Sequence, residues 1–180
     1  MIDKLGQWAE HWSFWVAVIV TVIGMEGVAL YMQYVLDQQP CRLCIHVRAY
    51  LLVVLMSGVM GLVWNSSTRQ RKMLGQTLVY LVGMVGLVGA FYSGWQAYQM
   101  ETNIFFGTCS FDAGFPAWFA LDEWIPSLFA PTATCGKATP FLFGMSLNEA
   151  IMYSTGSMML IASAVFFLNV LKNMRKMVDL

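Results

Sequence analysis

The residues of this chain best suited to chemistry are its four cysteines, Cys41, Cys44, Cys109 and Cys135. All four lie outside the long apolar stretches of the sequence, although those stretches make up more than half of the chain. A cysteine that merely fills a small apolar space would also be expected inside them. The thiols are therefore candidates for redox chemistry or for disulfides, which persist where the compartment is oxidising.

The first two cysteines form a Cys-x-x-Cys motif, and four cysteines allow three pairings. The short separation favours a Cys41–Cys44 disulfide, which would leave Cys109 and Cys135 to close the longer loop. Closing so short a loop removes little entropy from the unfolded chain, so the motif is a poor structural brace. The pair can open and close without moving the backbone, which suits thiol–disulfide exchange.

Pro40 precedes the motif, and an apolar stretch begins at about Cys44. We therefore expect Cys44 at a helix N-terminus, where the helix dipole and the free N–H groups stabilise a thiolate and lower its pKa. Arg48 follows four residues later, on the same helix face, and would add to this stabilisation. An arginine this close to a membrane boundary can also extend to the lipid headgroups instead.

Other interpretations of these residues stay open. The cysteines could form two inert disulfides, or a four-thiolate zinc site. Zinc usually takes a second close pair, whereas Cys109 and Cys135 are 26 positions apart, so we expect no metal. Glu26 interrupts an apolar stretch, where a charge is costly and suggests function; it can equally be protonated and bonded to a neighbouring helix. His46 is interpreted as a boundary residue.

The elements that position these residues follow from composition. Hydrophobic residues make up 58% of the chain and charged residues 11%, against roughly 25% charged in soluble domains. Four stretches reach the length of about 20 residues that a membrane span requires. We predict an all-α four-helix membrane bundle, one domain over 1–180, with spans at 13–36, 45–64, 73–95 and 147–171. The first stretch is too long for a cleavable signal peptide and is predicted to be a retained signal-anchor.

Glycines recur every third residue in the third span, at Gly83, Gly86 and Gly89. Small residues allow helix backbones to approach closely in lipid, so these glycines predict tight helix packing.

Basic residues are distributed unevenly between the connections. The 65–72 turn and the C-terminal tail each hold three, whereas the 37–44 and 96–146 loops hold one each, Arg42 and Lys137. The positive-inside rule places both termini and the 65–72 turn in the cytoplasm and the two loops outside. No basic run suggests nucleic-acid binding.

The long outer loop carries aromatic residues among a few charges over Phe115–Phe129. This mixture is typical of the headgroup boundary and predicts a short helix lying along the membrane surface.

Two segments carry a resemblance to a known family: "QPCRLCIHVR", which opens the second span, and "GTCSF…FPAWFALDEWIPSLF…TCG" in the long loop. With the four spans, they resemble the bacterial DsbB family of disulfide-generating proteins over nearly the whole chain. The resemblance implies an oxidase of the bacterial inner membrane. It would re-oxidise a periplasmic thioredoxin-fold partner of the DsbA type and pass electrons to a quinone, ubiquinone or menaquinone.

The resemblance also implies roles for individual residues. Cys109 would be attacked by the reduced partner, and Cys135 would then form a disulfide with Cys41. Cys44 would be left as a thiolate that donates to the quinone beside Arg48.

Two further residues come from the same resemblance. Glu26 matches the family's first-span glutamate. Gln96 stands where some members have a histidine near the quinone, and it can still donate a hydrogen bond to a quinone oxygen.

Three rival interpretations remain. One is a paralogue that serves a single dedicated partner, and another is a structural membrane protein whose disulfides only brace its loops. The third, an enzyme resembling vitamin K epoxide reductase, is disfavoured because its redox pair would be expected near the outer end of a late span.

Overall fold

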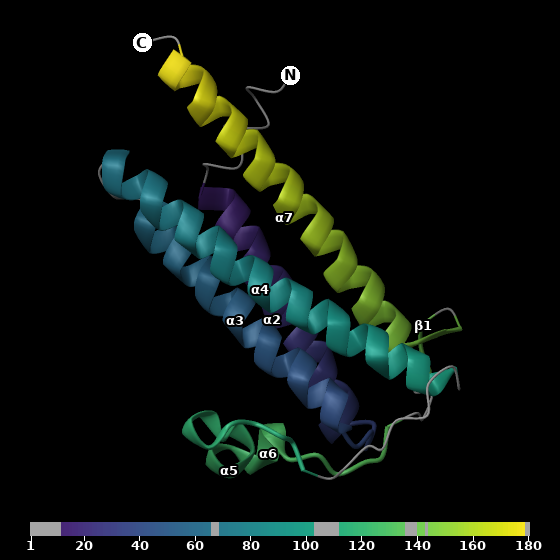
Figure 1. The fold of residues 1–180 in the computed structure, drawn as a ribbon. Helices are drawn as coiled ribbons and strands as arrows, with labels where there is room; N and C mark the ends of the chain where they lie inside the picture. The colour runs from purple at the N-terminus through teal and green to yellow at the C-terminus, as the bar shows by residue number, and fades with distance from the viewer. Residues whose placement is uncertain (1–11, 66–68, 103–111, 136–139, 143, 179–180) are drawn as a thin grey trace.

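Four long helices form the body of the molecule. The structure is a computed structural model of the 180-residue chain and describes residues 12–65, 69–102, 112–135, 140–142 and 144–178. The helices run side by side (Figure 1) and are α2 (Trp12–Tyr34), α3 (Arg42–Asn65), α4 (Arg69–Glu101) and α7 (Leu147–Val178).

Each of these helices contains a segment long and apolar enough to cross a membrane, with mean hydropathies of 2.0, 1.9, 1.6 and 1.7 in chain order. In lipid every backbone polar group must be bonded within the protein, and a continuous helix achieves this locally. The predicted four-helix membrane bundle is therefore confirmed. The helices differ from the predicted spans mainly at their ends: α3 begins at Arg42, and α4 continues to Glu101.

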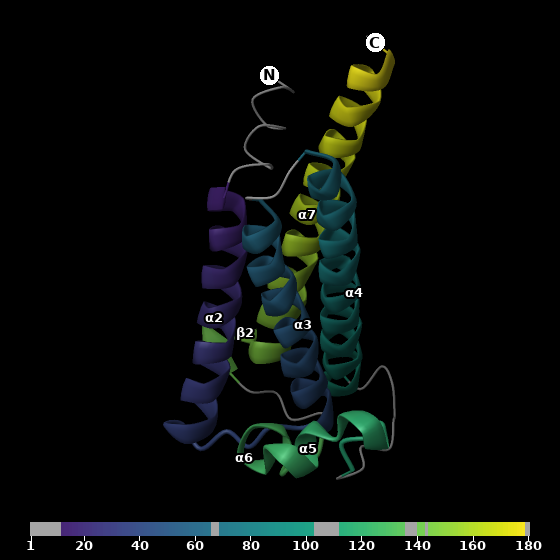
Figure 2. The ribbon, with the colours of Figure 1, turned by 90° about the vertical axis from the view of Figure 1, so that its left-hand side faces the viewer.

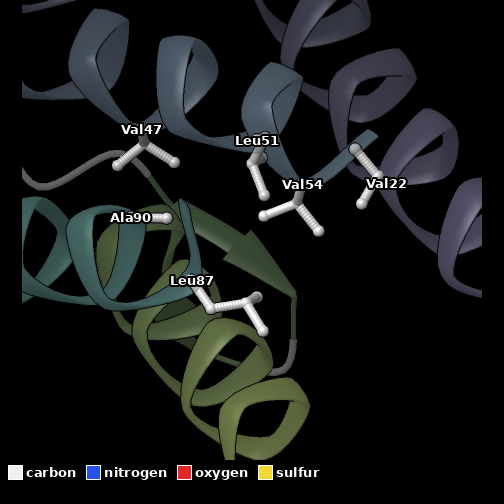
Figure 3. Close-up of a cluster of buried hydrophobic side chains, with 6 residues drawn as sticks. All are labelled: Val22, Val47, Leu51, Val54, Leu87 and Ala90. Carbon is white, nitrogen blue, oxygen red and sulfur yellow. The ribbon is translucent and has the colours of Figure 1, made fainter. Parts of the chain in front are cut away.

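Neighbouring helices pack in the order α2, α3, α4 and α7. A cluster of buried aliphatic side chains joins the first three of them (Figure 3): Val22, Val47, Leu51, Val54, Leu87 and Ala90. The spaced glycines let α3 and α4 approach closely, because a methyl group at Gly86 would lie 2.9 Å from the carbonyl oxygen of Tyr50. Many large apolar side chains on the outside, such as Val20 and Leu160, are exposed, as lipid contact requires.

A small β-hairpin precedes the last helix and was absent from the all-α prediction. Strands β1 (Pro140–Leu142) and β2 (Met145–Ser146) pair antiparallel, with Pro140 opposite Ser146. At the start of α7, Ser146 Oγ accepts the Glu149 N–H at 3.2 Å, and the Glu149 carboxylate accepts the Ser146 N–H at 3.0 Å. This reciprocal capping box fixes where the helix begins.

The described part of the long loop that carries α5 and α6 lies across the end of the bundle near the start of α3 (Figure 2). It contains three short helical turns, η1 (Ala117–Phe119), α5 (Leu121–Trp124) and α6 (Pro126–Phe129). The expected helix in this region is thus broken into short pieces. Ile125, at φ −136° and ψ 68°, separates α5 from α6, and Pro126 occupies the first position of α6. That these three short helical turns lie along a membrane surface stays a prediction.

Candidate active site

The Cys-x-x-Cys motif sits where α3 begins. Cys41 occupies the position before the first helical residue, and Cys44 lies in the first turn. Both are free thiols, and their Sγ atoms are 2.8 Å apart. A disulfide has a sulfur–sulfur distance of about 2.05 Å, so oxidation of the pair, with loss of two electrons and two protons, needs only a small side-chain movement. No group of three or more metal-ligating side chains occurs within the described ranges.

The helix N-terminus acts on Cys41 rather than on Cys44, where we had expected it. The backbone N–H of Cys44 points at Cys41 Sγ, 3.3 Å away, as it would at a serine or aspartate cap. The hydrogen bond from the Cys44 thiol, and after it the backbone N–H groups, lower the pKa of Cys41 from 9.0 to about 7, although burial opposes the shift. Cys41 is therefore about half ionised to the thiolate at pH 7.

The segment that carries Cys135 lies directly against the motif. The N–H groups of Thr132 and Ala133 both donate to the Pro40 carbonyl, at 3.1 and 3.2 Å, and Ala133 pairs with Cys41 in a parallel bridge. Cys135, Cys41 and Cys44 consequently line one small cavity of about 190 Å³.

Cys135 is itself in a disulfide. Cys109 lies outside the described residues, so three of the four predicted cysteines are brought together in the part of the chain that the structure covers.

The segment leading into η1 is held by two side chains from the first turns of α3. Arg42 Nε donates to the Ala113 carbonyl at 3.2 Å, and His46 Nε2 lies 2.7 Å from the same oxygen. The His46 ring also packs on Phe115, with ring centroids 5.3 Å apart. His46, interpreted from sequence as a boundary residue, thus fastens the long loop. The sequence does carry a signal for this role: His46 follows Arg42 by four residues, which places both side chains on one helix face.

Arg48 points inward, not toward headgroups, and is only 6% exposed. Its Nη1 donates to Gln33 Oε1 at 2.6 Å and to the Leu128 carbonyl at 3.0 Å, and its Nη2 donates to the Ala29 carbonyl at 3.1 Å. Arg48 therefore bridges α2, α3 and α6. A buried guanidinium requires such bonding, because an unpaired one would be very costly.

A larger pocket of about 450 Å³ opens beside the motif, between α2, α3 and α7. Cys44, Arg48 and Glu26 line it, and the remaining wall is mostly aliphatic. One carboxylate oxygen of Glu26, Oε1, is buried and has no hydrogen-bond partner among the described residues. Mainly apolar walls with a few polar groups are typical of sites for small organic ligands, and this volume lies within their usual range.

Gln96 does not line this pocket. It lies on α4, and its amide donates to the Tyr92 hydroxyl at 3.2 Å on the same helix. Of the predicted quinone-site residues in the described ranges, the structure brings together Cys44, Arg48 and Glu26, and leaves Gln96 apart.

Comparison with known proteins identifies the family. The family model "Disulfide bond formation protein DsbB" matches residues 11–167. The Disulfide bond formation protein B of Shewanella loihica is 34% identical over 97% of this chain and 99% of its own length. The protein of the same name from Photorhabdus laumondii is 32% identical over 75% of this chain and 77% of its own.

The family match, four apolar helices and a free Cys-x-x-Cys pair agree with one another. This chain is a multi-pass membrane protein and belongs to the DsbB family of disulfide bond formation proteins.

Proposed function

We propose that this protein re-oxidises the dithiol of a periplasmic thioredoxin-fold partner of the DsbA type and transfers the electrons to a membrane quinone. The observation that carries the proposal is the position of Cys44. Its side chain lines both the small cavity shared with Cys135 and the larger apolar pocket with Arg48. The Cys44 sulfur thus lies between a site for thiol exchange and a site for an organic acceptor.

The thiol steps are supported by the packing of three cysteines. The reduced partner attacks Cys109, forming a mixed disulfide and releasing the Cys135 thiolate; this role of Cys109 rests on the family. Cys135 then attacks Cys41 of the oxidised pair. The Cys41–Cys44 bond breaks, a Cys41–Cys135 bond forms, and the electron pair of the broken bond leaves on Cys44. The shared cavity and the backbone bridge at Cys41 hold these sulfurs near one another.

The pocket residues fit a quinone. Aliphatic side chains would enclose an apolar ring, and the Arg48 guanidinium would favour negative charge on a ring oxygen. Glu26 Oε1 is a buried oxygen that has no partner within the part of the chain that the structure describes. A bound quinone would supply a two-electron acceptor. The Arg48 guanidinium would stabilise negative charge near Cys44, and the aliphatic wall would keep water out of the pocket. The turnover assay, supplied with a ubiquinone or a menaquinone analogue, distinguishes between these two quinones.

The energetics favour such an acceptor. DsbA-type disulfides have potentials near −120 mV, about 150 mV above that of thioredoxin, so they are strongly oxidising and hard to regenerate. Passing electrons on to a lipid-soluble acceptor makes the overall transfer favourable. We further propose an inner-membrane location with both termini cytoplasmic, on the basic residues of the 65–72 turn and the C-terminal tail.

The test is turnover by the purified protein in detergent. Reduced DsbA-type partner and a short-chain ubiquinone or menaquinone analogue are supplied, and quinone reduction is followed by absorbance. We expect turnover by the wild type and none by Cys44→Ser or Cys109→Ser, with thermal unfolding confirming that both variants are folded. A folded wild type that reduces no quinone while its partner is available would refute the proposal.

A further inference from the structure

Gln33, near the outer end of α2, forms hydrogen bonds through both atoms of its side-chain amide. Its Oε1 accepts from Arg48 Nη1 at 2.6 Å, and its Nε2 donates to the Ser127 carbonyl on α6 at 3.1 Å. The same Arg48 nitrogen also donates to the Leu128 carbonyl. One amide therefore links the arginine on the pocket wall to a helix of the long loop.

Gln33 differs in kind from the other acceptors of Arg48. Those are main-chain carbonyls, at Ala29 and Leu128, whose positions the backbone determines. Within the described part of the chain, Gln33 is the side-chain acceptor of Arg48, and it does not itself line the pocket. Its amide thus helps to fix the rotation of the guanidinium without occupying ligand space.

The neutrality of this acceptor has an electrostatic consequence. A carboxylate at this distance would form a strong ion pair with the guanidinium and offset its charge. An amide accepts the same hydrogen bond and leaves the positive charge for an anion that develops in the pocket. Glu26, the acidic side chain on the pocket wall, interacts electrostatically with Arg48 but forms no hydrogen bond to it among the described residues.

We propose that Gln33 is a positioning residue for electron transfer to the acceptor: it orients Arg48 on the pocket wall and preserves the arginine's charge for the bound quinone. This inference rests on the proposed function, because the acceptor is the quinone assigned there. Gln33 acts on the acceptor through Arg48, so its replacement should affect quinone binding and reduction and leave thiol exchange with the partner unchanged.

Two substitutions test the two parts of the proposal, which are the orientation of Arg48 and the preservation of its positive charge. Gln33→Glu keeps an acceptor for Arg48 but adds a negative charge, and Gln33→Ala removes the acceptor. Both substitutions also remove the donor to the Ser127 carbonyl. Tyr34→Phe is the matched control, because the Tyr34 hydroxyl donates to the same Ser127 carbonyl at 2.7 Å but does not contact Arg48. The control therefore weakens the anchoring of α6 alone.

Three measurements are made on each protein in detergent. The first is kcat and KM for a short-chain ubiquinone analogue at saturating reduced partner. The second is the Kd of that analogue by calorimetry, without partner or turnover. The third is the rate of mixed-disulfide formation with reduced partner in the absence of quinone. Thermal unfolding verifies folding.

For Gln33→Glu we expect kcat/KM for the quinone analogue to fall about ten-fold or more, with a matching rise in Kd. Gln33→Ala should change in the same direction. Mixed-disulfide formation should stay within about two-fold of wild type, and Tyr34→Phe should match wild type in every measurement.

Wild-type Kd and KM in a folded Gln33→Glu variant would overturn the inference. An equal loss of quinone binding in Tyr34→Phe would overturn it too, because loop anchoring would then account for the effect. Either result leaves the proposed function intact, since that fails only if the wild type reduces no quinone.

Discussion

The reactivity of Cys41 gives the sharpest test of the site. We consider a protein in which Cys109→Ser and Cys135→Ser leave only Cys41 and Cys44, both reduced. The pKa of Cys41 is lowered to about 7, first by the hydrogen bond from the Cys44 thiol and then by backbone N–H groups, against the opposing effect of burial. Because the pKa is depressed, the thiolate dominates above pH 7 and is lost as the pH falls through 7.

The magnitude follows from the two pKa values. At pH 7 a thiol of pKa 7 is about half ionised, whereas one at the ordinary value of 9.0 is about 1% ionised, a ratio of about fifty. The less basic thiolate is also the weaker nucleophile, by roughly six- to ten-fold over two pKa units. Cys41 should therefore react with iodoacetamide about five to eight times faster than an ordinary thiol at pH 7, provided that access is equal.

The assay is the pH dependence of alkylation, followed by mass spectrometry of the peptide that contains the motif. We expect a midpoint near pH 7 for Cys41. Cys44→Ala removes the thiol donor and should move the midpoint upward, whereas Cys44→Ser retains an O–H donor and should move it less. A Cys41 midpoint above about 8.5 in the two-cysteine protein, or an unchanged midpoint in Cys44→Ala, would refute the reasoning.

Two further predictions concern glycines that meet neighbouring side chains. Gly61→Ala would push its methyl group into an indole ring of α2, so we expect a loss of about 1–3 kcal/mol in thermal unfolding in detergent, while Gly24→Ala, with nothing within 4 Å, should be neutral. Gly114 has φ +70° and lies against the Arg42 side chain, whereas Gly144 has φ +81° and open space around it. Alanine at either position adds about 1–2 kcal/mol of backbone strain. Only Gly114→Ala should also slow the transfer of electrons from the partner to the Cys41–Cys44 pair, and equal transfer rates in the two variants would contradict this.

Much of the fold was predictable because its determinants are local. In lipid, the backbone hydrogen bonds must close within each span, so length and hydropathy specify the helices without knowledge of their neighbours. Pro40 and the apolar stretch after the motif likewise predicted a helix beginning at the cysteine pair. The β-hairpin at 140–146 was missed because its strands are only three and two residues long, too short for a period-two pattern.

The site was predictable in its residue types and less so in its contacts. One pocket is lined by Cys44, Arg48 and Glu26, as a shared role requires. The resemblance also suggested Gln96, but the structure places Gln96 on another helix, where Tyr92 is its hydrogen-bond partner. The roles of His46 and Gln33 were not foreseen. Their partners, Ala113 and Ser127, are 67 and 94 residues away in the chain.

The sequence by itself therefore determined the four spans, the helix start at the Cys-x-x-Cys motif and the membership of the DsbB family, because hydropathy and motifs along nearly the whole chain carry them. Only the tertiary structure decided that the helix N–H meets Cys41, that Cys135 packs against the pair, and that Arg48 is held by α2 and α6. The N–H contact at Cys41 joins residues three positions apart, whereas the contacts of Cys135 and Arg48 join separate segments of the chain. Side-chain packing selects them, and no local pattern in the sequence encodes them.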